Sequence, residues 1–378
     1  MKKVKFGDVV KEVKINIDRS NNPYEYYVAG DHMDTEDLTI RRKGRFATDD
    51  VGPAFTRLFK PGQILYGSRR TYLKKVAVAD FEGICSNTTF VLETADESIL
   101  RQRLLPFIML TEDFTKWSIS KSKGSTNPYI LFSDLANYEF ELPDIDRQDE
   151  LVNLLWQGYA TKESYKKMIK AIDEMVKSQF IEMFGTPEEH PAGYAVKNLG
   201  DLSECYAGAT PSTKVKEYWD NGTIPWMSSG EVHMGHVTET ESKITESGYK
   251  HASTKMVPVH SVVIALAGQG KTRGTVAITE IPLCTNQSLC AIVPSKDIHY
   301  EYLYHNLKGR YLELRGMAGD VNGRGGLNLK IVQSIKVIVP PIAEQMKFVA
   351  IAQQADKSKF ELKQAIEKID KVMRALMQ

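Results

Sequence analysis

Apolar residues near the end of the chain recur at alternating steps of four and three residues. They are Leu362, Ile366, Ile369, Met373 and Leu376. This spacing keeps the apolar side chains on one face of an α-helix and is typical of a coiled-coil seam. The pattern follows two prolines, which mark a helix start. It predicts one long helix over residues 344–377.

A second seam in the same register lies near the middle of the chain. It consists of Tyr165, Ile169, Ile172 and Val176, which precede the first four residues of the other seam by 197 positions. We therefore predict a long helix over residues 147–184 that ends before Gly185, with a local bend at Gly158. At 1.5 Å per residue the helices would be about 57 and 51 Å long. Matched length and register favour their pairing over two helices lying separately on globular cores.

Short runs rich in β-branched and aromatic residues precede each long helix. They are bounded by glycine or proline, as strands commonly are. The clearest runs cover residues 64–66, 76–78, 89–92 and 261–266. Each long helix is therefore expected to follow a strand-rich domain.

Four short phrases occur twice, in the same order, along the chain. The pairs are 6–9 with 199–202, 26–31 with 226–231, 85–87 with 284–286, and 142–148 with 339–345. Their offsets of 193, 200, 199 and 197 residues are nearly constant, as expected for two diverged copies of one unit.

The predicted fold class is therefore α+β, with two tandem α/β domains that are each followed by a long α-helix. We expect the helices to pair as an antiparallel coiled coil with pseudo-twofold symmetry. The predicted segments are a first domain at 1–142, a first helix at 143–190, a second domain at 191–339 and a second helix at 340–378.

Composition excludes several classes of protein. The 378 residues are 42% hydrophobic and 26% charged, which excludes a disordered or solvating chain. With 49 basic and 48 acidic residues the net charge is +1, unlike that of a histone-like binder. Charge is nevertheless uneven, because ten basic and two acidic residues in 41–75 give a local sum of +8. Such a segment predicts a surface that attracts phosphate groups, the alternative being a solvated basic face.

Cysteine usage and the N-terminal segment bear on the compartment. The four cysteines are scattered and form no Cys-x-x-Cys motif, so neither a disulfide scaffold nor a zinc ribbon is expected. The first residues lack the apolar run of a signal peptide. Apolar stretches are shorter than the ~20 residues that span a bilayer. We expect a soluble protein of the reducing cytoplasm with no membrane partner.

Several motifs look catalytic but lack the necessary context. Residues 265–272 fit a loose phosphate-binding loop, yet residues 273–279 predict a turn and a strand where such a loop needs a helix. The Asn-Pro-Tyr runs at 22–24 and 127–129 match a methyltransferase motif only in part and predict turns. His233 and His236 lack further ligands at a recognised metal spacing. We predict no catalytic residue and no metal site.

In this arrangement the chain resembles the specificity (S) subunits of Type I restriction-modification systems. The resemblance covers essentially the whole chain and rests on the duplicated layout and on four phrases, found at 199–201, 224–231, 323–329 and 339–345. The first copy departs from the family phrase at residues 26–31, where Tyr-Tyr-Val-Ala-Gly-Asp stands in place of Trp-Met-Ser-Ser-Gly-Glu. Different domains are expected if the two copies recognise different sequences.

The resemblance implies a function in DNA recognition. In that family each domain is a target recognition domain that reads one half of a bipartite, asymmetric DNA site, and the long helices dock the methyltransferase subunits. It implies that this chain catalyses nothing and holds no cofactor, because S-adenosylmethionine, ATP and Mg belong to partner subunits. The implied partners are double-stranded DNA, two modification subunits and also restriction subunits, in a prokaryotic cytoplasm at the nucleoid.

Loops rich in basic, amide and glycine residues supply the predicted DNA contacts. Arginine pairs with guanine, and asparagine or glutamine with adenine, in the major groove, while small polar groups hold phosphates. The predicted contacts are Arg69, Arg70, Lys74, Lys123 and Asn127 in the first copy, and Gln269, Lys271, Arg273, Asn322 and Arg324 in the second. The eight residues predicted to pack the helices are Tyr165, Ile169, Ile172, Val176, Leu362, Ile366, Ile369 and Met373.

Two functions of other classes stay open on the residues alone. A coiled-coil scaffold could join two protein-binding domains without DNA, and its interactions would not share the steep salt dependence of DNA binding. A nucleotide-binding protein would use Lys271 and would bind ATP saturably.

Overall fold

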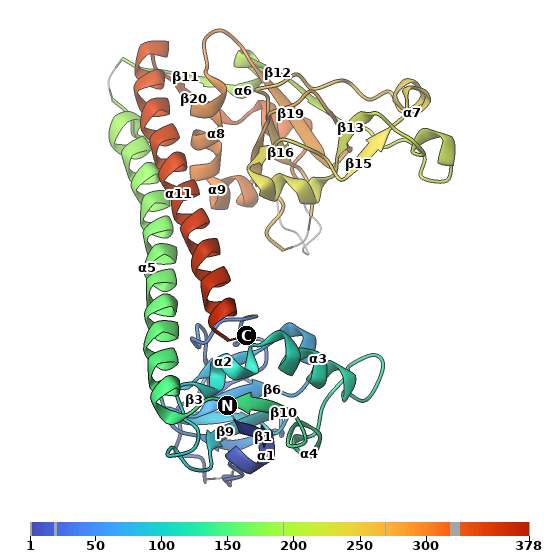
Figure 1. The fold of residues 1–378 in the computed structure, drawn as a ribbon. Coiled ribbons are helices and arrows are strands. Elements are labelled where there is room, and N and C mark those ends of the chain that lie inside the picture. Colours follow the sequence, from blue (N-terminus) through green and yellow to red (C-terminus); the bar gives the residue numbers. More distant parts are fainter. Residues whose placement is uncertain (1, 19–20, 192, 269, 318–325, 378) are drawn as a thin grey trace. The chain divides into compact units, whose positions relative to one another are not determined.

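The computed structural model describes residues 2–18, 21–191, 193–268, 270–317 and 326–377 (Figure 1). The chain divides into two compact units, each with its own hydrophobic core. Unit 1 consists of residues 1–166 and 363–378, and unit 2 of residues 167–362. Each unit thus contains one strand-rich domain and a part of both long helices.

Two four-stranded sheets and a strand pair form the domain of unit 1. The first sheet has the order β2 (Val10–Glu12), β9 (Thr89–Thr94), β6 (Ile64–Gly67), β7 (Val76–Val78). The second has the order β4 (Gly44–Arg45), β3 (Tyr26–Val28), β8 (Gly83–Ser86), β5 (Phe55–Phe59). The pair joins β1 (Lys2–Lys5) to β10 (Glu139–Leu142), the strand that leads into the first long helix.

The domain of unit 2 is built from corresponding strands. Its larger sheet has the order β12 (Ser203–Ala207), β19 (Leu289–Pro294), β16 (Val262–Ala265), β17 (Val276–Thr279), β14 (His236–Val237). A second sheet has the order β15 (Ser242–Ile244), β13 (Ile224–Met227), β18 (Cys284–Thr285). The pair joins β11 (Ala195–Asn198) to β20 (Lys336–Val339).

The central strands of both domains are buried on both faces. In β6, Ile64 and Tyr66 belong to one hydrophobic cluster and Leu65 to another. In β16, Val262 and Ile264 likewise separate from Val263 and Ala265. Because successive side chains of a strand point to opposite faces, a strand between two cores is apolar throughout. This explains why the predicted strands appear as continuous apolar runs.

The pairing register shows that the two domains are copies of one fold. Ile64 pairs with Leu92 in unit 1, and Val262 with Ile292 in unit 2. A parallel strand pair recurs as well, between β3 and β8 in unit 1 and between β13 and β18 in unit 2. The predicted duplication is therefore confirmed by the order in which the strands pair.

Short helices cover the sheets of each domain. In unit 1 they are α1 (Phe6–Val9), η2 (Thr71–Leu73), α2 (Leu105–Met109), α3 (Glu112–Ser120) and α4 (Phe132–Leu135). In unit 2 they are α6 (Leu199–Leu202), η3 (Lys216–Tyr218), η4 (Ser229–Met234), α7 (Glu246–His251), α8 (Tyr300–Gly309), α9 (Tyr311–Gly316) and α10 (Leu329–Gln333).

The repeated glycine of α1 and α6 allows a close backbone approach. A Cβ on Gly7 would lie 2.6 Å from Cβ of Ala136, and one on Gly200 would lie 2.9 Å from Cβ of Gln333. Both distances are shorter than real Cβ contacts, so any side chain would force the segments apart. The repeated Phe-Gly-Asp and Leu-Gly-Asp phrases thus have a structural cause.

The two long helices have nearly the predicted bounds. Helix α5 covers Ile145–Phe184, 40 residues, and α11 covers Ile342–Leu376, 35 residues. Asp144 caps α5 by accepting a hydrogen bond from Arg147 N at 3.0 Å, and Gly185, with φ +74°, follows its end. Helices of these lengths are about 60 and 52 Å long. Helix α5 continues through Gly158, whose missing side chain leaves room for Met373 of α11.

The helices pack against one another within each unit. In unit 1 a Cβ on Gly158 would lie 3.2 Å from Met373, and Lys162 forms an ion pair with Asp370. In unit 2 Asp173 forms an ion pair with Lys359, and the rings of Phe180 and Phe348 are 5.1 Å apart. Residue numbers rise along α5 as they fall along α11 in both units, so the pairing is antiparallel, as predicted. All eight predicted seam residues are buried or partly buried.

A buried glutamine ties the first turn of each long helix to its own domain. Gln148 Nε2 donates to the carbonyls of Ile99 and Pro143, and its Oε1 accepts from Arg101 N. Gln345 makes the same three bonds, with the carbonyls of Asp297 and Pro340 and with His299 N. The repeated phrase that ends in glutamine is therefore the joint between domain and helix.

Candidate nucleic-acid interface

Two segments of unit 1 that are distant in sequence are joined by backbone hydrogen bonds. Arg70 N donates to the carbonyl of Pro128 at 2.7 Å, and Ile130 N donates to that of Ser68 at 2.9 Å. Lys123 and Tyr129 exchange two further bonds of 2.7 and 2.9 Å. We call residues 68–74 and 121–130 the loop pair of unit 1. The bonds make it one continuous surface.

Four of the five predicted DNA contacts of the first copy lie exposed on this loop pair. They are Arg69, Arg70, Lys123 and Asn127. Arginine, lysine and amide groups so arranged can donate hydrogen bonds to phosphates and base edges. The structure thus brings together donors that the sequence separates by more than fifty positions.

Lys74 is the exception, because its side chain is largely buried and its charge is engaged by two carboxylates. Its Nζ lies 2.9 Å from a carboxylate oxygen of Glu36 and 2.8 Å from one of Glu112, and its side chain is only 15% exposed. Burial alone would lower the pKa of Lys74, but the hydrogen bonds to the two carboxylates outweigh it and raise the pKa. The ammonium group is therefore charged and already paired.

The turn that carries these residues has an unusual backbone. Arg70 has φ 51° and Lys74 has φ 45°, on either side of η2. Non-glycine residues in this left-handed region cost about 1–2 kcal/mol each. Such strain clusters at functional sites, and here it occurs in the turn that carries Arg69 and Arg70.

Sequence reasoning missed two exposed tyrosines on the loop pair. Tyr72 is 52% exposed and Tyr129 is 40% exposed. Their signal was an aromatic residue beside the basic residues of a predicted loop, a combination that suits contact with bases.

Unit 2 has a corresponding loop pair, of which part is described. Leu327 N donates to the carbonyl of Leu266 at 2.9 Å, as Ile130 N does to Ser68. Lys271 is exposed on the first loop, and its carbonyl accepts from the hydroxyl of Tyr311 at 3.2 Å. Gln269, Asn322 and Arg324 lie outside the described residues.

Two arginines of unit 2 differ from expectation. Arg273 is buried, so its guanidinium group does not present itself on the surface as a base-reading side chain would. Arg315 was missed by sequence reasoning. Its Nη1 donates to the carbonyl of Gly270 and to the hydroxyl of Tyr311 at 3.0 Å, which places a second cation beside the Lys271 loop.

A family model matches the chain twice, over residues 1–174 and 191–371. Its description is "Type I restriction modification DNA specificity domain". The chain belongs to this family. Both copies of the duplicated fold are therefore DNA specificity domains of the Type I restriction-modification kind.

Curated relatives carry consistent names. The chain is similar to the specificity subunit of the Type I restriction enzyme EcoR124I/EcoR124II of Escherichia coli, with 32% identity over 42% of this chain and 40% of the relative. It is similar to the MjaIX specificity subunit of Methanocaldococcus jannaschii, with 30% identity over 44% and 38%. The chain thus spans about two fifths of these relatives. The HindI specificity subunit of Haemophilus influenzae is matched over 90% of this chain and 89% of its own length, at 20% identity.

Solved structures of Type I systems share the fold. A chain from a structure titled "Structural basis underlying complex assembly and conformational transition of the type I R-M system" matches with a TM-score of 0.62 and 18% identity, over 100% of this chain and 96% of that chain. The S subunit of a Type I system from M. genitalium matches with a TM-score of 0.56 and 17% identity, over 100% and 96%.

For this member of the specificity-domain family, the local charge of +8 overstates the positive surface. Five of the ten basic side chains of residues 41–75 pair with carboxylates, all of them from outside the segment. The pairs are Arg41 with Asp37 and Glu163, Arg42 with Asp34, Arg45 with Glu25, Arg57 with Glu12, and Lys74 with Glu36 and Glu112. Only part of the segment's charge is therefore available to phosphates, because a sum along the sequence omits partners brought by folding.

The discounted phosphate-binding motif is a hairpin turn. Residues after Lys271 form a turn and then β17, which pairs antiparallel with β16. In the part of this motif that the structure describes, no helix directs backbone N–H groups at a phosphate. His233 and His236 also diverge, since His233 lies 3.1 Å from Thr272 Oγ1 and His236 lies 2.7 Å from Glu280. Among the described residues, no group of three or more His, Cys, Asp or Glu could hold a metal ion.

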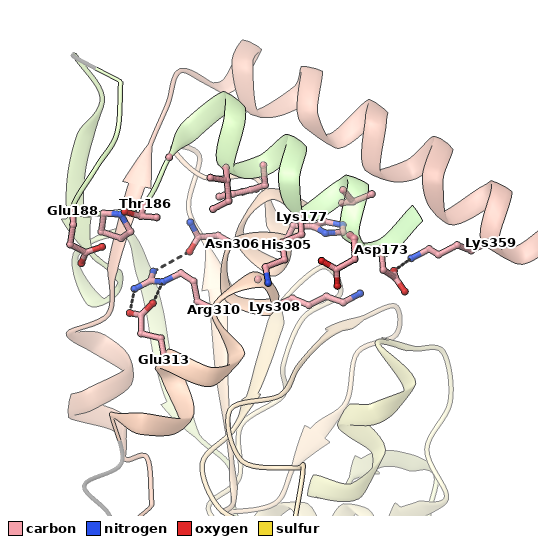
Figure 2. Close-up of a pocket in the computed structure, with 17 residues that line it drawn as sticks. Asp173, Lys177, Thr186, Glu188, His305, Asn306, Lys308, Arg310, Glu313 and Lys359 are labelled. Carbon is pink, nitrogen blue, oxygen red and sulfur yellow. Dashed lines mark hydrogen bonds and ion pairs between the residues drawn. The ribbon is translucent and has the colours of Figure 1, made fainter. Parts of the chain in front are cut away.

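Unit 2 also contains a pocket of about 240 Å³ beside the end of α5 (Figure 2). Its walls carry two sets of paired charges, Asp173 with Lys359 and Arg310 with Glu313. Lys177 and Lys308 add further cations, and Phe180 is part of the apolar lining.

No described helix is long and apolar enough to cross a bilayer.

Proposed function

We propose that this chain is the DNA-recognition subunit of a Type I restriction-modification complex. It reads a bipartite, asymmetric DNA site, with one unit for each half-site. The observation that carries the proposal is the duplicated specificity domain, in which the same loop pair recurs with different side chains. A recognition fold that is kept while its exposed residues change suits two half-sites of different sequence.

In unit 1 the proposed DNA contacts are the exposed residues Arg69, Arg70, Lys123 and Asn127. In unit 2 they are Lys271, together with Gln269, Asn322 and Arg324, which remain sequence predictions. The paired Lys74 and the buried Arg273 act as parts of the scaffold instead. The chain itself is non-catalytic, and methyl transfer and cleavage belong to partner subunits in the cytoplasm, at the nucleoid.

The long helices are the proposed platform for two modification subunits and, through them, restriction subunits. Outward-facing apolar residues support this role, because exposed apolar side chains on a helix mark interaction surfaces. In unit 2 they include Met168, Met175 and Phe360, the last 60% exposed. The seam residues Ile366 and Ile369 are partly buried in the helix pair and hold the platform together.

Mapping methylated sites across a genome, with and without this chain, tests the proposal directly. A bipartite methylation motif should appear only when the chain is expressed with its modification subunits. Purified complex should also bind DNA carrying that motif, with affinity that falls steeply as salt rises. An unchanged methylation map would reject the proposal.

Co-purification with the modification subunit tests the platform. Met168→Asp with Met175→Asp should reduce capture while the chain keeps its melting temperature. Ile366→Asp with Ile369→Asp should lose capture and stability together, because it places two charges in the seam. Capture by the first double variant at the wild-type level would remove these residues from the docking surface.

The same purified complex tests the two alternative functions, a scaffold that binds no DNA and a nucleotide-binding protein. A scaffold without DNA would show no binding that depends on salt and sequence. A nucleotide-binding protein would bind ATP saturably through Lys271, which is inconsistent with the turn observed there.

A further inference from the structure

Three residues of unit 1 form a short row across the loop pair. Tyr129 is opposite Arg69 on one side and opposite Lys123 on the other, through two antiparallel bridges. Residues that are directly opposite in antiparallel pairing point their side chains to the same face. The row therefore presents an aromatic ring between two cations.

The hydrogen bonds define the spacing of the row. Lys123 and Tyr129 form a hydrogen-bonded pair, because each donates its N–H to the carbonyl of the other. Arg69 and Tyr129 form a non-hydrogen-bonded pair, since the flanking bonds join Arg70 to Pro128 and Ile130 to Ser68. Cα atoms are about 5.5 Å apart in a hydrogen-bonded pair and about 4.5 Å apart in a non-hydrogen-bonded pair. The two cations thus leave the backbone about 10 Å apart.

All three side chains are accessible. Arg69 is exposed, and among the described residues no carboxylate lies within ion-pair distance of it. Lys123 Nζ lies 3.0 Å from Asp134 Oδ2, with half of the lysine side chain exposed. The ammonium group has three donors, so Lys123 can bind a phosphate while it stays paired with Asp134.

At the two corresponding positions that the structure describes, unit 2 has neither the arginine nor the tyrosine of this row. The bond from Ile130 N to the Ser68 carbonyl matches the bond from Leu327 N to the Leu266 carbonyl. Arg69 and Tyr129 therefore correspond to Ala267 and Gly326, both exposed. The same fold forms with a methyl group and a hydrogen at these places, so the arginine and the tyrosine are not needed to build it.

We propose that Tyr129 is a specificity-determining residue of unit 1. Arg69 and Lys123 bind phosphates, and between them the tyrosine contacts base edges in a DNA groove. The inference rests on the proposed function and adds that the two half-sites are read by different chemistry, with an aromatic contact in only one of them.

The dimensions and chemistry of the row suit this ligand. The grooves of B-DNA are about 6 and 12 Å wide between phosphate walls, so long cationic side chains starting about 10 Å apart can reach both walls. Phosphate contacts fix position but carry no sequence information, whereas contacts in the groove do. A tyrosine adds a flat apolar ring and a hydroxyl that can donate or accept.

Selection of binding sites from random duplex DNA, with the full-length chain, tests the inference. The wild type should enrich a bipartite motif. Tyr129→Ala should relax one or two base pairs of a single half-site, by about 5- to 100-fold in relative affinity, and leave the other half unchanged. Arg69→Ala should instead weaken binding to all sequences and reduce the salt slope by about one.

The variant Arg69→Ala with Tyr129→Gly reproduces the residues of unit 2 and serves as a second test. It should fold like the wild type, by circular dichroism and melting temperature, and lose the same base preferences. Lys116→Ala removes an exposed cation elsewhere in unit 1 and should change neither half-site. If Tyr129→Ala retains the complete wild-type motif, the inference is overturned while the proposed function stands. If the wild type enriches no motif, the proposed function itself fails.

Discussion

Lys162 Nζ lies 2.8 Å from Asp370 Oδ1 in unit 1, and in unit 2 the same two positions of the repeat meet again, with Lys359 Nζ 2.8 Å from Asp173 Oδ1. Each residue is 197 positions from its counterpart. In each unit, the lysine comes from the helix that follows that unit's own domain, and the aspartate from the other long helix. The duplication thus includes the contacts that set the register of the helices.

Breaking one of these ion pairs should destabilise the unit that contains it. The Lys162 side chain is 12% exposed and that of Asp370 32%, so Lys162→Ala removes a partly buried, charged hydrogen bond and should cost about 1–3 kcal/mol. The charge swap Lys162→Asp with Asp370→Lys should recover most of the loss. Urea denaturation measures the free energy of unfolding of both the single variant and the charge swap. Lys166→Ala, which removes a more exposed pair within one helix turn, is the control and should cost under about 0.5 kcal/mol.

A large side chain at Gly158 should separate the helices in unit 1. The Cβ alone would lie 3.2 Å from Cγ and Sδ of Met373. Gly158→Leu should therefore destabilise by about 1–3 kcal/mol through overpacking, although leucine favours helix over glycine by nearly 1 kcal/mol. Adding Met373→Ala should restore stability. Ala171→Leu, at an exposed position of the same helix, should have little effect, and an equal loss there would contradict the packing argument.

Removing the buried glutamine should loosen the joint between domain and helix. Gln345→Ala leaves His299 N and two carbonyls without their partners. Unsatisfied buried polar groups cost about 1–3 kcal/mol each, so we expect a loss of about 3 kcal/mol. Gln148→Ala should act similarly in unit 1. Gln364→Ala, at an exposed position of α11, is the matched control. Thermal melts of the three variants measure the loss of stability, which should be large for the two buried glutamines and small for the control.

Unit 2 should lose stability in mild acid. Burial, reinforced by nearby Lys308, lowers the pKa of His305 from 6.5 to about 4. Between these values the unfolded chain binds the proton and the folded chain does not. Stability is therefore complete above about pH 6.5 and falls as the pH drops toward 4, by up to about 3 kcal/mol.

The variant His305→Gln isolates this contribution. It removes the titrating ring that packs on Phe348, so its stability should be lower at pH 7.5 but should depend less on pH. Denaturation at pH 7.5 and 5 compares the two proteins. A parallel decline in both would assign the acid sensitivity to other groups.

The helices and the duplication could be predicted because their signals are local or repeat at a constant interval. The seam from Leu362 to Leu376 and the two prolines before it predict a helix over residues 344–377. The observed helix α11 begins two residues earlier, at Ile342. Four repeated phrases anticipate two copies of one fold, which the matching strand pairs β6 with β9 and β16 with β19 show. Two of those phrases proved to mark a close backbone approach at Gly7 and a buried hydrogen-bonding side chain at Gln148.

The candidate site could be predicted only in part. Arg69, Arg70, Lys123 and Asn127 were identified by residue type, but the backbone bonds that join their loops, and the central place of Tyr129 among them, depend on contacts between distant segments. Lys74 looked like a phosphate ligand because its partners, Glu36 and Glu112, are nearly forty positions away on either side.

By itself, then, the sequence determined the duplicated layout, the long helices and the kind of residue available for DNA. Periodicity and repetition are properties of the chain alone, so they can be read without coordinates. Only the tertiary structure decided which charges are free and which are paired, and which side chains share a surface. Electrostatic and hydrogen-bonding partners are chosen by distance in space, and folding brings together residues that the sequence keeps apart.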